Sequence, residues 1–310
     1  MKKALGVVLL LAIVVSVARV WEPDRPVEAL TARWAPPPSQ FVELDGLRVH
    51  LRDVGPRDDP TPLVLLHGTS ASLHTWQGWV SALEGKRRVI TLDLPGFGLT
   101  GPFPDGDARL ERTLNLLVAL LKKLEVARCV LAGNSYGGRL AWEFAVAHPA
   151  TVSKLVLVDA GGYPRNSTSV PLGFRIAQTP GLRVLGEVLL PRGLIERSLK
   201  NVYGDPGKVT PELVERYFEL TLRAGNRAAL GRRMDQVPAE GDVAKLKSLP
   251  TPTLILWGGQ DRLIPPDNGR RFDDDLPRSR LVMFEALGHV PHEEDPAATV
   301  AELEKFLAED

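Results

Sequence analysis

The segment Gly133-Asn134-Ser135-Tyr136-Gly137-Gly138 contains the residue types most suited to chemistry. It follows the apolar run Cys129 to Ala132 and precedes a helical pattern that begins near Tyr136. A serine on a sharp strand-to-helix turn needs unusual backbone angles and close neighbours without side chains, which the flanking glycines provide. The start of the helix would direct backbone N–H groups at a developing oxyanion. We therefore predict that Ser135 is a nucleophile.

A serine hydroxyl needs a base and an acid that orients this base. The C-terminal part offers both, because Asp261 follows the apolar run Thr253 to Trp257 and His289 follows the run Arg280 to Phe284. Neighbouring parallel strands deliver such residues to one edge of a sheet. We predict Asp261 as the acid and His289 as the base.

Other residues compete for these roles. Asp159 ends the strand-like run before it and is a rival of Asp261 for the acid, although it could equally cap the following turn. His292 is the alternative base, but we expect it at the start of a solvated stretch. Asp93 is expected to fix a turn through hydrogen bonds to the backbone.

The oxyanion would need a second donor besides the backbone N–H of Tyr136. His67-Gly68-Thr69-Ser70 directly follows the strand-like run Leu63 to Leu66. We expect the backbone N–H of Thr69 to be this donor and His67 to shape the loop.

From Phe41 onward, continuous apolar runs alternate with helical patterns, which is typical of a mostly parallel α/β sheet buried on both faces. Asp45-Gly46 predicts a hairpin between the first two strands. Strands are expected at 41–44, 47–54, 63–66, 89–92, 129–132, 155–158, 253–257 and 280–284, and helices at about 110–124, 136–148, 211–222 and after Pro296.

The alternation stops between residues 163 and 247, which show helical patterns without a convincing strand. We expect a helical cap there, inserted into a core made of residues 41–162 and 248–310. Residues 22–40 contain five prolines and are expected to form an extended spacer.

Lysine plus arginine and aspartate plus glutamate both number 38, so no net charge favours nucleic acid. The single cysteine, Cys129, lies in an apolar run and is expected to be buried. No cluster of histidine, cysteine and carboxylate residues has the spacing of metal ligands.

Lys2 and Lys3 precede an apolar stretch from Ala4 to Ala18, which is the pattern of an export segment. Two outcomes are possible for residues 1–21. Residues 4–21 are expected to form an uncleaved membrane anchor with Trp21 at the membrane interface, and the alternative is a signal peptide that is cleaved near Ala18. Either outcome predicts a location outside the cytoplasm.

The chain resembles the α/β-hydrolase superfamily from about Phe41 to its end. The resemblance depends on His67-Gly68-Thr69, on Asp93-Leu94-Pro95-Gly96-Phe97-Gly98, on the Ser135 segment, and on Gly258-Gly259-Gln260-Asp261 with Gly288-His289. It implies an eight-stranded sheet, a helical cap after the sixth strand, and no cofactor. A serine at position 135 argues against the branches with a carboxylate nucleophile. The asparagine before it, Asn134, resembles the residue that carbon–carbon bond hydrolases of ring-cleavage products have at this position, although esterases carry it too.

These observations predict a carboxylesterase-like serine hydrolase that acts on small or medium-sized esters through an acyl-enzyme. The alternatives are a carbon–carbon bond hydrolase or a cofactor-free peroxidase of the same fold, and a ligand-binding protein without turnover. We expect Trp76, Leu263 and Val290 in the substrate pocket.

Overall fold

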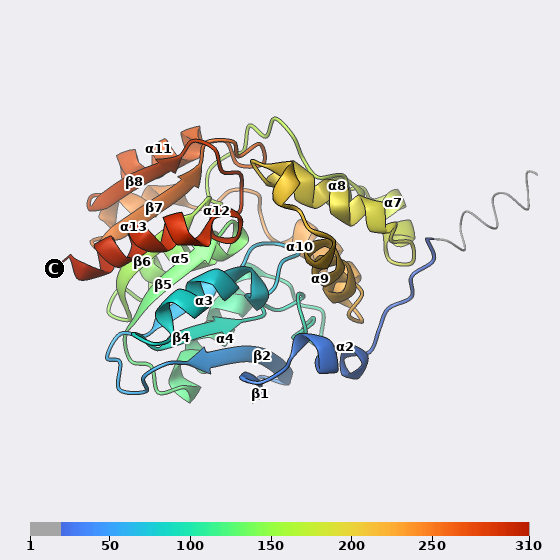
Figure 1. Cartoon of the computed structure of the whole chain (residues 1–310), viewed down its shortest axis with the longest axis horizontal. Helices are drawn as coiled ribbons and strands as arrows, with labels where there is room; N and C mark the ends of the chain where they lie inside the picture. Colours follow the sequence, from blue (N-terminus) through green and yellow to red (C-terminus); the bar gives the residue numbers. More distant parts are fainter. Residues whose placement is uncertain (1–19, 310) are drawn as a thin grey trace, which may run out of the picture.

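A computed structural model describes residues 20–309 of the chain. Its centre is an eight-stranded sheet with the strand order β1-β2-β4-β3-β5-β6-β7-β8, in which β2 runs antiparallel to β1 and to β4, and the remaining pairs are parallel (Figure 1). The strands are β1 (Ser39–Leu44), β2 (Leu47–Val54), β3 (Leu63–Leu66), β4 (Val89–Leu92), β5 (Cys129–Asn134), β6 (Val152–Val158), β7 (Thr253–Gly258) and β8 (Ser279–Phe284). The predicted eight-stranded, mostly parallel sheet is confirmed.

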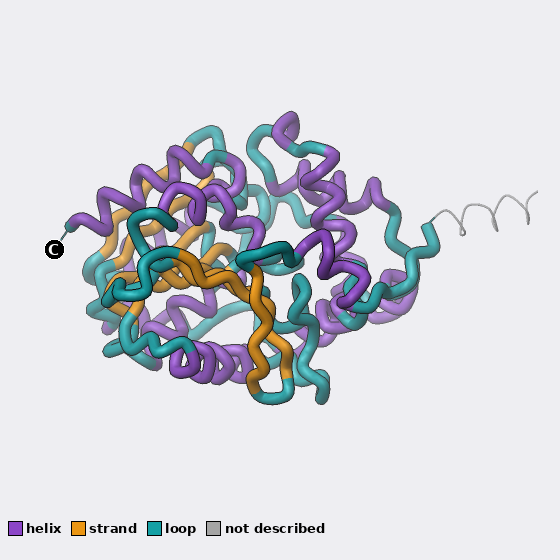
Figure 2. The backbone as a smooth tube through the Cα atoms, turned by 60° about the horizontal axis from the view of Figure 1, so that its bottom comes forward, coloured by secondary structure: helices purple, strands orange, loops and turns teal. Residues whose placement is uncertain are grey.

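Two helical layers cover the sheet (Figure 2). On one face, apolar side chains of α3 (Gln77–Leu83) and α13 (Pro296–Ala308) share a core with the strands. On the other face the core includes α4 (Leu110–Lys123), α5 (Tyr136–Ala147) and α11 (Asp267–Asp275). Strands β3, β4, β5 and β7 are buried along their whole length, and β6 is buried from Leu155 to Val158, which explains why these segments are continuous apolar runs.

The turn between β1 and β2 follows the prediction from Asp45-Gly46. Asp45 has φ 52° and Gly46 has φ 73°, so both central residues adopt the left-handed conformation of a tight hairpin.

Between β6 and β7 the described chain contains helices and no strand. The α-helices are α6 (Leu172–Gln178), α7 (Pro180–Gly186), α8 (Arg192–Val202), α9 (Pro211–Thr221) and α10 (Asn226–Gln236), with short 3₁₀ helices at η2 (Pro206–Lys208) and η3 (Val243–Ser248). Figure 1 shows α7 to α10 gathered at one end of the sheet, away from the C-terminus. We refer to residues 163–247 as the cap.

The predicted extended spacer is wrong for most of residues 22–40. Val27–Trp34 forms helix α2, and β1 already begins at Ser39. Polar contacts dock this segment on the cap, because Glu219 of α9 accepts hydrogen bonds from Arg25, at 2.9 Å, and from the Trp34 indole, at 2.7 Å. The prolines suggested an extended chain, whereas tertiary hydrogen bonds and the burial of Leu30 decide the conformation.

The predicted membrane segment at residues 4–21 lies outside the described residues except for its end. Leu190 donates a backbone hydrogen bond to Val20, at 2.9 Å, and Trp21 forms a β-bridge with Leu189, so this end lies against the cap. Within residues 20–309 we find no helix with the length and apolar character needed to cross a membrane. The predicted membrane attachment, and the location outside the cytoplasm that was inferred with it, therefore have no support in the described residues.

Candidate functional site

Ser135 occupies the turn between β5 and α5 with φ 55°, a strained conformation for a residue with a side chain. Its neighbours leave no room for side chains. A Cβ atom on Gly133 would lie 2.2 Å from the carbonyl oxygen of Gly137, and one on Gly137 would lie 2.2 Å from that of Leu66. The two flanking glycines therefore permit the turn that brings Ser135 to the wall of a cavity.

His289 and Asp261 form a buried hydrogen-bonded pair. The distance between Nδ1 of His289 and Oδ2 of Asp261 is 2.7 Å. Oδ1 of Asp261 accepts the backbone N–H groups of Leu263, at 2.8 Å, and Ile264, at 2.9 Å, so the carboxylate is well supplied with donors. Because the aspartate accepts the proton of Nδ1, Nε2 of His289 is left as the basic nitrogen. His289 lines the same cavity as Ser135.

Asp159, the rival acid, lies beside this pair in a different setting. Its side chain is fully buried, and Oδ1 accepts the backbone N–H of Gly258 at 3.0 Å. One oxygen of Asp159, one of Asp261 and a ring nitrogen of His289 lie within 4.8 Å of one another. His289, however, donates its hydrogen bond to Asp261.

The backbone of His289 is fixed as firmly as its ring. Its N–H donates to the carbonyl of Val202 at the end of cap helix α8, at 2.7 Å. Its carbonyl accepts a hydrogen bond from Nδ2 of Asn134, at 2.9 Å, which also donates to Val158 at 3.1 Å. Asn134, which the sequence marked only as a family feature, thus ties the nucleophile segment to the histidine loop.

Glu294 is a supporting residue that sequence reasoning missed. Its buried carboxylate accepts the backbone N–H of Gly288, at 2.8 Å, and those of Gly204, at 3.0 Å, and Asp205, at 2.8 Å. It therefore joins the residue before His289 to the cap segment that follows α8. Nothing in the sequence around Glu294 distinguishes it from a surface glutamate.

The loop after β3 is fixed by hydrogen bonds of His67 and borders the cavity that Ser135 lines. His67 donates from Nδ1 to the carbonyl of Gly68, at 2.7 Å, and Nε2 accepts the N–H of Leu94, at 2.9 Å. Burial lowers the pKa of this imidazole, so His67 is a neutral structural residue. Thr69 lies in the cavity wall, and the N–H of Tyr136 is the first of helix α5, without an acceptor one turn earlier in that helix.

Two residues lie where the sequence did not place them. Trp76 is fully buried against His292, with ring centroids 4.0 Å apart, and is not part of the cavity wall. His292 is not solvated, because Pro291–Glu294 forms the short helix α12 that packs against α3 and the 3₁₀ helix η1 (Leu73–Trp76). Asp93 accepts the backbone N–H groups of Leu73, at 2.7 Å, and Leu99, at 2.8 Å, as expected of a residue that fixes a turn.

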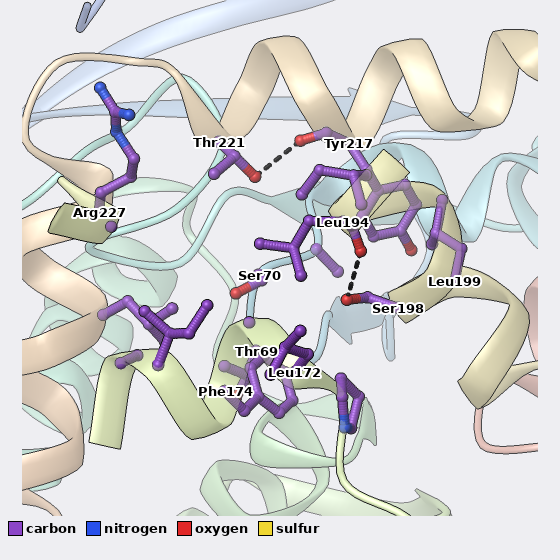
Figure 3. A pocket seen from close by; sticks show the side chains of 18 of the residues that line it. Thr69, Ser70, Leu172, Phe174, Leu194, Ser198, Leu199, Tyr217, Thr221 and Arg227 are labelled. Atoms are coloured by element: carbon purple, nitrogen blue, oxygen red, sulfur yellow. Dashed lines mark hydrogen bonds between the residues drawn. The ribbon is translucent and has the colours of Figure 1, made fainter. Parts of the chain in front are cut away.

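The cavity between Ser135 and the cap has a volume of about 470 Å³. Figure 3 shows side chains from α6, α8 and α9 converging on the loop of Thr69 and Ser70. The wall is mostly aliphatic: it includes Leu263 and Val290 from the core and, from the cap, Leu172, Ile176, Leu194, Ile195, Leu199, Leu220 and Leu230.

Two hydroxyl-bearing residues of the cap that line this space, Ser198 and Thr221, use their hydroxyl groups within their own helices. The hydroxyl of Ser198 donates to the carbonyl of Leu194, at 2.8 Å, and that of Thr221 donates to the carbonyl of Tyr217, at 2.7 Å (Figure 3). Both hydroxyl groups are therefore occupied by their own helices. The cap side of the cavity offers a ligand mainly apolar surface.

Three arginines also border the cavity. Arg183 pairs with Asp235 through two hydrogen bonds of 2.6 and 2.9 Å. Arg227 pairs with Asp24 at 2.6 Å. Arg197 is exposed and donates from Nε to the carbonyl of Gly193 at 3.1 Å.

Asp159, Asp261 and His289 also form the one group in the described chain with the residue types and spacing of a metal site. The oxygens of Asp261 are already occupied by two backbone N–H groups and by the imidazole. This donor set fits a carboxylate that orients a histidine better than a metal ligand.

Comparison with known proteins agrees with this geometry. A family model described as the alpha/beta hydrolase fold matches residues 61–296. A 2-hydroxy-6-oxononadienedioate/2-hydroxy-6-oxononatrienedioate hydrolase of Burkholderia vietnamiensis is 30% identical over 266 residues, which cover 81% of this chain and 89% of that protein. The 2-hydroxymuconate semialdehyde hydrolase of a Pseudomonas species is 28% identical over 274 residues, covering 85% and 92%.

One solved structure, described as a membrane phospholipase A and a bacterial virulence factor, has a TM-score of 0.75 and 26% identity and covers 99% of this chain and 98% of its own. The family model spans well over half of the chain. The chain therefore belongs to the α/β-hydrolase family, and this membership supports hydrolysis of a small-molecule substrate.

Proposed function

We propose that this protein is a serine hydrolase that cleaves carboxylic esters with an apolar acyl chain. The observation that carries the proposal is the buried His289–Asp261 pair, 2.7 Å apart, in the wall of the same apolar cavity as the strained Ser135. A nucleophile, a base and an orienting acid are the parts that acyl transfer requires.

In the proposed mechanism Ser135 attacks the ester carbonyl carbon while Nε2 of His289 takes the hydroxyl proton. The backbone N–H groups of Thr69 and Tyr136 would stabilise the negative charge on the carbonyl oxygen. His289 then protonates the departing alcohol, and a water molecule that it activates releases the acid from the acyl-enzyme. Asp261 keeps the proton of the imidazole on Nδ1 and stabilises the imidazolium that forms.

The character of the cavity supports an apolar acyl group. Ser198 and Thr221 hydrogen-bond to their own helices, and Arg183 and Arg227 are paired with aspartates. A substrate with two carboxylates would find these cations already occupied. The similarity to the structure described as a phospholipase, an ester hydrolase, extends over 99% of the chain and points the same way.

A carbon–carbon bond hydrolase is the second candidate, and the named relatives favour it over an esterase. Two of them are named for 2-hydroxy-6-oxononadienedioate and for 2-hydroxymuconate semialdehyde, substrates of that branch. Such an activity would use Ser135 and His289 as well, and it would need a cation for the substrate carboxylate. Arg197 at the edge of the cavity is the residue to test for this role.

A panel of p-nitrophenyl esters from acetate to laurate separates the two candidates. Because each buried methylene group contributes about 0.8 kcal/mol, we expect kcat/KM to rise by up to about fourfold for each added methylene until the cavity is filled. Leu194→Trp should remove this increase for long chains and leave the acetate ester near the wild-type rate.

The matching assay uses 2-hydroxymuconate semialdehyde. Its hydrolysis without ester turnover, together with a loss of that activity in Arg197→Ala, would replace the esterase proposal by the second candidate. Labelling of Ser135 without turnover of either substrate would favour the remaining alternatives, which are a cofactor-free peroxidase and a ligand-binding protein without turnover.

A further inference from the structure

Asp159 lies at the end of β6 with φ 45°, a strained backbone for a residue that no step of the proposed mechanism uses. Its side chain has no exposed surface. The N–H of Gly258 donates to Oδ1, whereas Oδ2 is buried and has no hydrogen-bond partner among residues 20–309. A buried carboxylate oxygen without a donor is costly.

Asp261 beside it is supplied quite differently. Three donors reach its two oxygens: the N–H groups of Leu263 and Ile264 and Nδ1 of His289. The two carboxyl groups approach within 4.8 Å of each other in a buried environment, where both cannot be ionised without strong repulsion. One proton resolves both problems, and it belongs on the group with fewer donors.

We propose that Asp159 is a protonated carboxylic acid whose Oδ2 hydroxyl donates a hydrogen bond to the carboxylate of Asp261, which makes Asp159 a positioning residue for the acid of the site. The proton gives Oδ2 the partner that it otherwise lacks. The carboxylate of Asp261 gains a fourth donor and is held in the orientation that His289 requires.

The electrostatics of the surrounding elements agree with this assignment. Burial raises the pKa of Asp159 well above its usual range, and the neighbouring carboxylate of Asp261 raises it further, as does Glu294 from α12. His289 is the nearby group that can carry positive charge, and its Nδ1 proton is already directed at Asp261.

The assignment predicts how two substitutions differ. Asparagine at position 159 has the same shape, and its carbonyl oxygen would face the N–H of Gly258, so its NH₂ group would donate to Asp261 as the acid does. Alanine removes this donor. Without this hydrogen bond the carboxylate of Asp261 would attract the imidazolium of His289 more strongly. The kinetic pKa of His289 should therefore rise in Asp159→Ala.

Infrared difference spectra of the folded protein at neutral pH test the proton directly. We expect the wild type to show the carbonyl stretch of a protonated carboxyl group that is absent from Asp159→Asn and present in the matched control Glu143→Gln. The absence of such a band from the wild type, or its persistence in Asp159→Asn, would overturn the proposal. This readout does not depend on turnover, so it stands even if the esterase proposal fails.

The role as a positioning residue rests on the proposed function and is tested by the pH dependence of kcat/KM. We expect Asp159→Asn to keep the wild-type profile within about threefold, and Asp159→Ala to shift the acidic limb to higher pH. Asp261→Asn, the comparison variant, should lose about 10⁴-fold in kcat, because the imidazole would adopt the wrong tautomer. Equal profiles for Asp159→Asn and Asp159→Ala would assign Asp159 a purely structural role.

Discussion

At the scale of single residues, His289 is held from three sides. Its ring donates a hydrogen bond to Asp261, its backbone N–H donates to the carbonyl of Val202 in the cap, and its carbonyl accepts a hydrogen bond from Asn134. In the proposed mechanism Asp261 is the acid, which agrees with the two backbone N–H groups that stabilise its ionised form, whereas Asp159 receives only one. The number of donors at each carboxyl group thus distinguishes two aspartates that end neighbouring strands.

The burial of His74 predicts how the free energy of unfolding depends on pH. His74 donates to the carbonyl of Trp34 at 2.8 Å, and burial lowers its pKa from 6.5 to about 3. As the pH falls below about 6.5, the unfolded chain binds a proton that the folded one does not, so stability decreases, by at most about 1.4 kcal/mol per pH unit from this residue. Because Asp159, with a raised pKa, acts in the opposite direction, a variant is needed to isolate the contribution.

His74→Gln keeps a donor for Trp34 and removes the titration. Urea unfolding between pH 7.5 and 5 should show the variant less stable at the higher pH, with the difference narrowing as the pH falls. A difference that stays constant would show that His74 is not neutral in the folded protein.

Several of these residues could be predicted from the sequence because their function depends on short segments. Ser135 is marked by the glycines around it, and Asp261 and His289 are marked by their places directly after apolar runs. Trp76 and His292 could not be placed in this way. Their positions depend on how α12 packs against α3, which is a tertiary contact without a local pattern.

At the scale of elements, the cap and the histidine loop behave as one unit. Helix α8 lines the cavity with Leu194 and Leu199, and its last residue accepts the N–H of His289. The contact is close, since a Cβ atom on Gly288 would lie 2.3 Å from the carbonyl oxygen of Val202. A substrate that moves α8 would therefore also move His289.

Glu294 holds this unit together, and its replacement tests the coupling. Glu294→Gln keeps one acceptor oxygen but removes the negative charge. This charge strengthens the hydrogen bonds that Glu294 accepts from the N–H groups of Gly288, Gly204 and Asp205. We expect kcat/KM to fall by about tenfold to a hundredfold, because hydrogen bonds to a charged group contribute about 1.5–3 kcal/mol. Ester hydrolysis and the melting temperature are measured together.

Glu293→Gln is the matched control. The side chain of Glu293 joins the cap to the same helix α12 through Arg216 and through Tyr217, at 2.8 Å, and none of its hydrogen bonds within residues 20–309 goes to the histidine loop. It should lower thermal stability and leave the kinetic pKa of His289 unchanged. If both variants affect kcat and the kinetic pKa equally, the effect of Glu294 is general destabilisation.

The strands were predictable to within a few residues because apolar runs buried on both faces have few alternatives. The cap helices were less so. Helix α7 has no buried residue and α6 has only Ala177, so neither carries a strong apolar stripe. Their positions follow from the cavity that they enclose and not from their own sequence pattern.

At the scale of the whole molecule, the parallel sheet brings three distant segments to one edge, and the cap closes an apolar space above them. Residues 22–40 were expected to form an extended spacer, but Arg25 and α2 pack on the cap, as does Trp21 just before this segment. A proline-rich composition indicated an extended chain, but it carried no information about the partners Glu219 and Leu189. The sequence thus predicted that Ser135, Asp261 and His289 lie together at one edge of the sheet, but it did not predict how residues 22–38 pack on the cap.

The most direct test of the account is the covalent labelling of Ser135. The folded protein is treated with a fluorophosphonate, and the adduct is located by intact mass and peptide mapping. We predict a single adduct on Ser135 that is absent from Ser135→Ala and forms at least a hundredfold more slowly in His289→Asn, because the base no longer takes the hydroxyl proton. No adduct on the folded wild type, or an adduct on another residue, would contradict the account.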